Sequence, residues 1–245
     1  MGVIKGIDEL IYRIYKFSKY VIFSILNKDL NLKRFIKEFS YIFTHINLGE
    51  KIIPWIPIKA KLWLDKNLKH NMILYEYGSG ISTLYFSSKV KMIHSIEHDK
   101  DWYEKMNEKL QKIEKENYEY SLIEPDYEYD KDSKKTTSIY TSKLENYQYS
   151  NFKKYVKSVE KYPDKYFDLI FIDGRARIAC ILHSIKKIKS GGYMVLDNSD
   201  EKQYKIAHKI LKKYKKFDFF GIAPSNPYLR FTKISFWKMT IWKIE

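Results

Sequence analysis

The segment from residue 72 to residue 99, MILYEYGSGISTLYFSSKVKMIHSIEHD, constrains the fold more than any other part of the chain. An apolar run (MILYEY) leads into a pair of glycines, Gly78 and Gly80, and a second apolar run (MIHSI) ends on Glu97. Paired glycines permit a tight turn from a strand into a helix, and an acidic residue about 20 positions further on can accept hydrogen bonds from a ribose. The pattern predicts a βαβ unit that binds a nucleotide-like ligand.

The same segment argues against a dinucleotide. A pyrophosphate at a helix N-terminus is accompanied by a third glycine, and the turn here reads Gly78-Ser79-Gly80-Ile81-Ser82-Thr83. Glu76 also stands two residues before the first glycine, where an acidic side chain favours a ligand with positive charge.

The E-x-G-x-G motif, followed by an acidic residue at the end of the next strand, resembles the class I S-adenosylmethionine-dependent methyltransferases. The resemblance covers roughly residues 54 to 240. It implies that Glu76 lies near the amino group of the methionine moiety and that Glu97 holds the ribose. It assigns these cofactor-binding positions: Glu76, Gly78, Ser79, Gly80, Ser82, Thr83, Glu97, His98 and Asp173. The alternative is that the glycines serve only a tight turn in another Rossmann-like protein.

The length of 245 residues predicts one large domain with an extension. We place an N-terminal helical extension at residues 1–53 and the S-adenosylmethionine-binding methyltransferase domain at 54–245. The single cysteine, Cys180, excludes a disulfide framework and stands in an apolar stretch typical of a core. No apolar run approaches the length of a membrane span, so a cytoplasmic protein is expected.

Residues 3–48 carry apolar side chains at helical spacing with lysines between them. Such basic amphipathic helices either cover an apolar surface of their own domain, which we favour, or make peripheral contact with an anionic membrane surface.

The net charge of +15 raises the question of a nucleic-acid partner. The chain has 40 lysines and only five arginines, and the lysines are spread along its whole length. Arginine supplies the planar fork that phosphate and base recognition favour, so a coding bias explains the composition as well as a binding surface does. Nucleic acid is therefore a possible partner that the sequence does not favour.

From residue 72 onwards, predicted strands and helices alternate, as in a parallel sheet covered on both faces. The fold class is α/β, a Rossmann-like seven-stranded, mostly parallel sheet with helices on both faces and a C-terminal antiparallel hairpin. Strands are expected at 72–77, 92–97, 118–123, 167–173, 193–197 and twice in the tail, and helices at 58–68, 81–88, 100–116, 151–161, 177–188 and 200–214. Residues 124–150 are polar and longer than an ordinary connection, and form either a lid over the substrate or a disordered insertion.

Four of the predicted strands end on acidic residues, and the carboxyl ends of strands are where open α/β sheets bind ligands. Two of these, Asp173 and Asp197, remain for the reaction, together with Asn198. Their oxygens are ligands that Mg²⁺ accepts. The pattern resembles the metal-dependent O-methyltransferases, in which the metal lowers the pKa of a bound hydroxyl. The alternative is that Asp173 and Asp197 cap helices or bind substrate and cofactor directly.

The chain departs from that metal-dependent family at one position. The resemblance calls for a lysine base three residues after the strand-end aspartate, and Ala176 stands there, between Arg175 and Arg177. Either arginine could bind a carboxylate or phosphate of the substrate, or form a salt bridge within the loop. We take Asp173, Arg175 and Asp197 as the candidate catalytic residues.

The sequence thus predicts an S-adenosylmethionine-dependent methyltransferase that acts on a hydroxyl of a small molecule or glycan, with Mg²⁺ as a possible second cofactor. The alternatives are an RNA or protein methyltransferase that uses the basic surface, and a non-catalytic interaction protein that retains the fold. The oligomeric state is left open.

Overall fold

The computed structural model describes residues 52–113, 116–127, 139–142, 147, 150–224 and 234–245, together with six isolated positions nearer the N-terminus. Those six positions, which lie within the predicted extension, are all helical: 15, 18, 21, 22, 25 and 40. The rest of residues 1–51, residues 114–115, most of residues 128–149 and residues 225–233 lie outside the described part.

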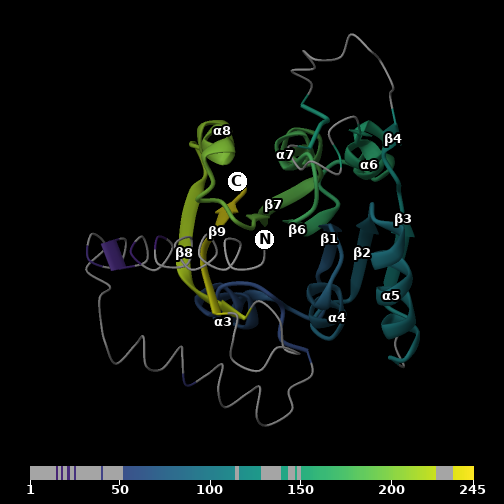
Figure 1. The fold of residues 1–245 in the computed structure, drawn as a ribbon, viewed down its shortest axis with the longest axis horizontal. Helices are drawn as coiled ribbons and strands as arrows, with labels where there is room; N and C mark the ends of the chain where they lie inside the picture. Colours follow the sequence, from purple (N-terminus) through teal and green to yellow (C-terminus); the bar gives the residue numbers. More distant parts are fainter. Residues whose placement is uncertain are drawn as a thin grey trace, which may run out of the picture.

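A seven-stranded sheet forms the centre of the molecule (Figure 1), with strand order β3-β2-β1-β6-β7-β9-β8. Five strands are parallel, and β9 runs antiparallel to both β7 and β8. This confirms the predicted sheet and its C-terminal hairpin. The strands are β1 (Ile73–Tyr77), β2 (Met92–Glu97), β3 (Tyr118–Leu122), β6 (Phe167–Ile172), β7 (Ile188–Leu196), β8 (Lys215–Pro224) and β9 (Ile234–Lys243).

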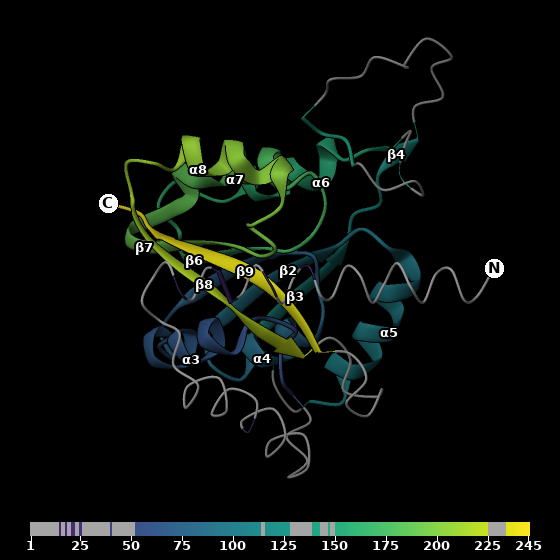
Figure 2. The same ribbon diagram turned by 60° about the vertical axis from the view of Figure 1, so that its left-hand side comes forward.

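Helices cover both faces of the sheet (Figure 2). One face carries α3 (Ile58–Asn67), α4 (Ile81–Ser87) and α5 (Lys100–Gln111), and the other carries α6 (Lys153–Lys157), α7 (Arg177–Ser184) and α8 (Lys205–Ile210). Each face has its own apolar core. Because successive side chains of a strand point to opposite faces, Tyr75 and Tyr77 pack with α6 and α7, while Leu74 packs with α3 and α4. Cys180 is fully buried on α7, as its apolar neighbours predict.

Several helices and strands begin or end at residues other than those predicted from the sequence. Strand β7 begins at Ile188, five residues before the predicted start, and pairs with Phe167 across an irregularity in β6. Gly191 and Gly192 interrupt the apolar run here, so the sequence hides the first half of the strand. Three predicted helices are shorter and continue as 3₁₀ turns or begin with one: η3 (Ser158–Lys161) follows α6, η4 (Ile185–Lys187) follows α7 and η5 (Lys202–Tyr204) precedes α8.

The described parts of the 124–150 segment are attached to the domain. β4 (Asp126–Tyr127) pairs antiparallel with β5 (Ser150–Asn151), and the backbone N–H of Phe152 donates to the carbonyl of Tyr140. Within the described ranges, no helix is long and apolar enough to cross a bilayer.

Candidate active site

A cavity of about 530 Å³ opens at the carboxyl ends of β1, β2 and β6. This is the edge at which open α/β sheets bind their ligands. The cavity is lined by the turns after these strands, by α5 and by three aromatic side chains: Gly78, Ser79, Glu97, His98, Asp99, Asp173, Gly174, Arg175, Trp55, Trp102 and Tyr147.

The floor of the cavity is formed where two backbone turns cross. Gly78 has φ of +88°, and a Cβ atom built there would stand 2.6 Å from the Cα of Gly174. A Cβ on Gly174 would in turn overlap the hydroxyl of Tyr155. Only glycine fits either position, which lets a ligand approach the backbone closely. Gly80 is different, since a Cβ there would have Ser82 Oγ at 3.7 Å as its nearest neighbour, and Gly80 does not line the cavity.

Glu97 lies at the end of β2 as predicted and is only 2% exposed. Its Oε2 accepts hydrogen bonds from the backbone N–H and the hydroxyl of Ser79, both at 3.0 Å. Its Oε1 accepts from the backbone N–H groups of His98 and Asp99. Burial acts to raise the pKa of Glu97, but the contacts with His98 and Asp99 outweigh it and lower that pKa. Glu97 therefore brings a negative charge to the cavity.

His98 packs beneath Tyr147, with their ring centroids 5.2 Å apart, and its Nδ1 lies 2.6 Å from Glu97 Oε1. It lines the cavity. Ser79, the second residue of the glycine turn, is the only turn residue besides Gly78 among the described lining residues. Its hydroxyl also shares a 2.6 Å hydrogen bond with Tyr120 of β3.

Glu76, Ser82 and Thr83 do not line the cavity, contrary to the prediction. The Glu76 side chain is fully buried on the α4 face of the sheet and accepts three hydrogen bonds of 2.6 Å, from Ser82, Thr83 and Ser95. Thr83 also accepts from the backbone N–H of Gly80. This cluster fixes the first turn of α4 from below and so supports the glycine turn that precedes it. Burial raises the pKa of Glu76 to about 7.

The predicted metal ligands are held by other groups. Arg177 donates to Asp173 Oδ1 at 2.8 Å, to Asn198 Oδ1 at 3.1 Å and to the carbonyl of Asp197 at 2.7 Å. The Asp197 carboxylate is 2% exposed and accepts from the indole N–H of Trp237. The guanidinium thus occupies the space between Asp173 and Asn198 in which a cation would have to bind.

The predicted magnesium site is therefore not formed. Among the described residues, no group of three or more His, Cys, Asp or Glu side chains is placed to hold a metal ion. Asp197 and Asn198 also do not line the cavity, so the predicted catalytic role of Asp197 loses its geometric basis. Of the three, Asp173 alone faces the cavity, with its side chain 34% exposed. Its enclosure by the protein raises the pKa of Asp173, against the lowering effect of Arg177 and Arg175.

The two arginines have different environments. Arg177 is 8% exposed, and its guanidinium is fully engaged in hydrogen bonds at the strand ends, since it also donates to the carbonyls of Asp173 and Gly174. Arg175 lines the cavity, and its guanidinium carbon lies 5.6 Å from the centre of the Tyr147 ring. The salt-bridge alternative thus holds for Arg177, while Arg175 is the arginine that projects into the cleft.

Sequence reasoning did not identify the aromatic walls of the cavity. Trp102, in the first turn of α5, donates from its indole N–H to the carbonyl of Ser79 at 2.9 Å. Trp55 packs beside Trp102, with ring centroids 6.3 Å apart. Tyr147 donates to Asp99 at 3.2 Å, and Asp99 also caps α5 by accepting from the N–H of Trp102. The one available signal was Asp99, which directly follows the strand-end Glu97 and precedes a helix.

The cavity is acidic although the chain is basic. Its lining holds four carboxylates and two cations, with Asp101 and Lys105 of α5 completing the set already described. The chain as a whole carries +15. An ionised lining of this kind attracts a cationic ligand and repels phosphate.

The strand order, the glycine crossing and the strand-end Glu97 together define the fold of the class I methyltransferases. No protein-family model and no curated protein matches the chain. Among solved structures, it is similar to a precorrin-6y C5,15-methyltransferase from Geobacter metallireducens, with 14% identity, 76% of this chain and 87% of that chain covered, and a TM-score of 0.51. It is also similar to an rRNA methylase from Streptococcus thermophilus, with 14% identity, 77% and 97% covered, and a TM-score of 0.50. At these identities the likeness shows the fold alone.

Proposed function

We propose that the protein is an S-adenosylmethionine-dependent methyltransferase. The observation that carries the proposal is the position of Glu97 beside the glycine turn, where Ser79 donates to its carboxylate, in the same cavity that the Gly78–Gly174 crossing lines. A carboxylate can accept hydrogen bonds from both hydroxyls of a ribose, and the crossing leaves the backbone open to the methionine moiety. His98 and Ser79 complete the proposed cofactor site.

The first turn of α4 distinguishes this ligand from a nucleotide phosphate. Thr83 takes the N–H of Gly80, and the Glu76 carboxyl lies buried directly below that turn. This helix N-terminus has already paired the N–H of Gly80 and has a carboxyl group beneath it, so it is poorly suited to bind an anion. The carboxylates of the cavity lining favour the sulfonium of S-adenosylmethionine instead.

The acceptor that we propose is a hydroxyl of a small molecule or glycan. Arg177 holds Oδ1 of Asp173, so Oδ2 remains to accept the proton of that hydroxyl. Bound S-adenosylmethionine would supply the methyl group, which would pass from its sulfur to the acceptor oxygen and leave S-adenosylhomocysteine as the product. The burial that raises the pKa of Asp173 makes its carboxylate a stronger base than an exposed aspartate. Trp55 and Trp102 offer aromatic faces on which a sugar or planar ring can stack.

Calorimetry with S-adenosylhomocysteine tests the cofactor assignment. The wild type should bind, and Glu97→Gln should weaken binding about 10- to 100-fold, because a charge-assisted hydrogen bond contributes about 1.5 to 3 kcal/mol. Glu104→Gln is the matched control, since Glu104 is an exposed residue of α5 outside the cavity lining. A wild type that fails to bind would favour the non-catalytic alternative.

An RNA acceptor is the second candidate, and the net charge of +15 is the observation that favours it. The acidic cavity opposes it, because the phosphates beside a target base would face Glu97, Asp99 and Asp173. Binding to a polynucleotide that weakens steeply as salt rises would support RNA, since counterion release makes phosphate contacts salt-dependent.

A further inference from the structure

Arg175 is a cation with no ion-pair partner among the described residues. Its Nε atom is buried and has no hydrogen-bond partner in the described part of the chain. In contrast, the guanidinium of Arg177, two residues further on, donates hydrogen bonds to five acceptors. Burying a charged donor without a partner is costly, so such a group in a cavity indicates a ligand that completes it.

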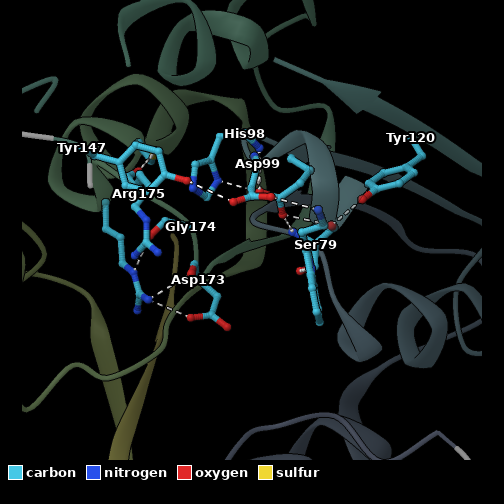
Figure 3. A network of polar contacts seen from close by, with 12 residues as sticks. Ser79, His98, Asp99, Tyr120, Tyr147, Asp173, Gly174 and Arg175 are labelled. Carbon is cyan, nitrogen blue, oxygen red and sulfur yellow. Dashed lines mark hydrogen bonds and ion pairs between the residues drawn. The ribbon is translucent and has the colours of Figure 1, made fainter. Parts of the chain in front are cut away.

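The position of Arg175 is fixed by its neighbours. The Tyr147 ring supports the guanidinium at 5.6 Å, and Asp99 anchors the Tyr147 hydroxyl from the opposite wall. Figure 3 shows Tyr147, Arg175, Gly174 and Asp173 gathered on one side of the cavity, away from Ser79 and Tyr120. A guanidinium stacked on a ring keeps its planar fork in one orientation, so less entropy is lost when a ligand binds.

We propose that Arg175 and Tyr147 form a carboxylate-binding subsite of the cavity. A carboxylate matches the planar fork of a guanidinium with two parallel hydrogen bonds. It carries a single negative charge, whereas a phosphate would bring up to two beside the carboxylate of Asp173. The subsite places a cation beside Tyr147 in a cavity whose lining is otherwise mostly acidic.

Two molecules could supply the carboxylate, and this step rests on the proposed function. One is the cofactor itself, through the amino-acid end of its methionine moiety. The other is an acceptor with an acid group, such as a uronic acid. In both cases Arg175 touches the bound molecule and sets which molecules the site accepts.

The test compares three probes on wild type and Arg175→Met by calorimetry: S-adenosylhomocysteine, methylthioadenosine, which lacks the amino-acid part, and glucuronate with neutral glucose as its comparison. If the cofactor supplies the carboxylate, Arg175→Met weakens S-adenosylhomocysteine about 10- to 100-fold and leaves methylthioadenosine unchanged. If the acceptor supplies it, both adenosine ligands bind unchanged. The wild type saturated with S-adenosylhomocysteine then binds glucuronate but not glucose, and the variant binds neither.

Lys100→Met is the matched control, because Lys100 is an exposed residue of α5 outside the cavity lining and its loss changes the net charge equally. It should leave all the binding constants within about twofold of wild type, the size of a screened charge effect. Should Arg175→Met fail to fold, Arg175→Lys replaces it, since lysine keeps the charge and loses the fork.

The proposal is overturned if the substituted protein binds every probe as the wild type does, or if both adenosine ligands weaken equally, which would indicate a packing role for Arg175. A wild type that binds neither adenosine ligand would instead contradict the proposed function. The carboxylate subsite would then be tested on the free protein, where binding of glucuronate but not of glucose would support it and equal binding would contradict it.

Discussion

The crossing of Gly78 and Gly174 yields a quantitative prediction about the contact between Gly174 and Tyr155. A Cβ atom on Gly174 would overlap the Tyr155 hydroxyl and would stand 3.1 Å from the backbone nitrogen of Gly78. The φ angle of Gly174 is not in the left-handed region, so Gly174→Ala tests steric contact alone. The new methyl group would have the backbone of Gly78 on one side and the fully buried Tyr155 on the other, and moving either neighbour would disturb close packing.

We expect Gly174→Ala to lower the free energy of unfolding by about 2 to 3 kcal/mol, the upper part of the range for overpacked cores. Tyr155→Phe should have little effect or stabilise by up to about 1 kcal/mol, because the hydroxyl that it removes is buried and has no partner among the described residues. The double variant should recover about 1 to 2 kcal/mol of the loss, since phenylalanine leaves space for the new methyl group.

Urea unfolding of the four proteins, followed by circular dichroism at 25 °C, measures the coupling energy. Tyr77→Phe is the control, because that hydroxyl is equally buried but donates to the carbonyl of Val156 and should cost about 1 kcal/mol. If the Gly174 and Tyr155 effects add within about 0.5 kcal/mol, the steric account of the crossing is wrong.

Three further outcomes are expected from the same structure. Gly78→Ala combines a left-handed φ with a 2.6 Å approach to Gly174 and should abolish S-adenosylhomocysteine binding in calorimetry. The pKa of Glu76 is about 7 in the folded protein and 4.5 in the unfolded chain, so the folded protein binds this proton more tightly. The contribution of protonated Glu76 to the free energy of unfolding is therefore fully present below pH 4.5 and is lost as the pH rises to about 7. The wild type should lose about 3 kcal/mol relative to Glu76→Gln over that range in urea unfolding, and parallel curves would contradict this. Cofactor affinity and methyl transfer should be unchanged by a chelator, because Arg177 fills the predicted metal position, and inactivation by the chelator would refute that assignment.

The fold could be predicted because its signals are local. Each central strand is an apolar run that ends on an acidic residue or a turn, and the alternation with helices leaves few topologies. The start of β7 was hidden because Gly191 and Gly192 resemble a loop, whereas backbone hydrogen bonds with Ile244, just after β9, hold them in place. Pairing of this kind is a long-range effect that no window of sequence shows.

The site was predicted only in part, because a strand end fixes where a residue lies but not which way its side chain points. Gly78, Ser79, Glu97 and Asp173 line the cavity as expected. Glu76 lies on β1, two residues before Gly78, and its side chain projects to the α4 face. Successive side chains of a strand alternate between the two faces, and the tyrosines on either side of Glu76 point to the other face, so the alternation would have predicted this. Trp55 and Tyr147 come from distant segments, so spacing around the motif could not reveal them.

The metal prediction failed for an instructive reason. Two acidic strand ends and an asparagine indicate a divalent cation only if the chain itself supplies no positive charge to them. Here Arg177 begins α7 four residues after Asp173, preceded by Ala176 with a φ of 48° that turns the chain into the helix. From that position the guanidinium reaches the ends of both β6 and β7. An arginine in the first helical turn after a strand-end aspartate therefore argues against a metal ligand at that aspartate. Among the described residues Arg177 binds only Oδ1 of the Asp173 carboxylate, so Oδ2 stays available for the general-base role that we propose.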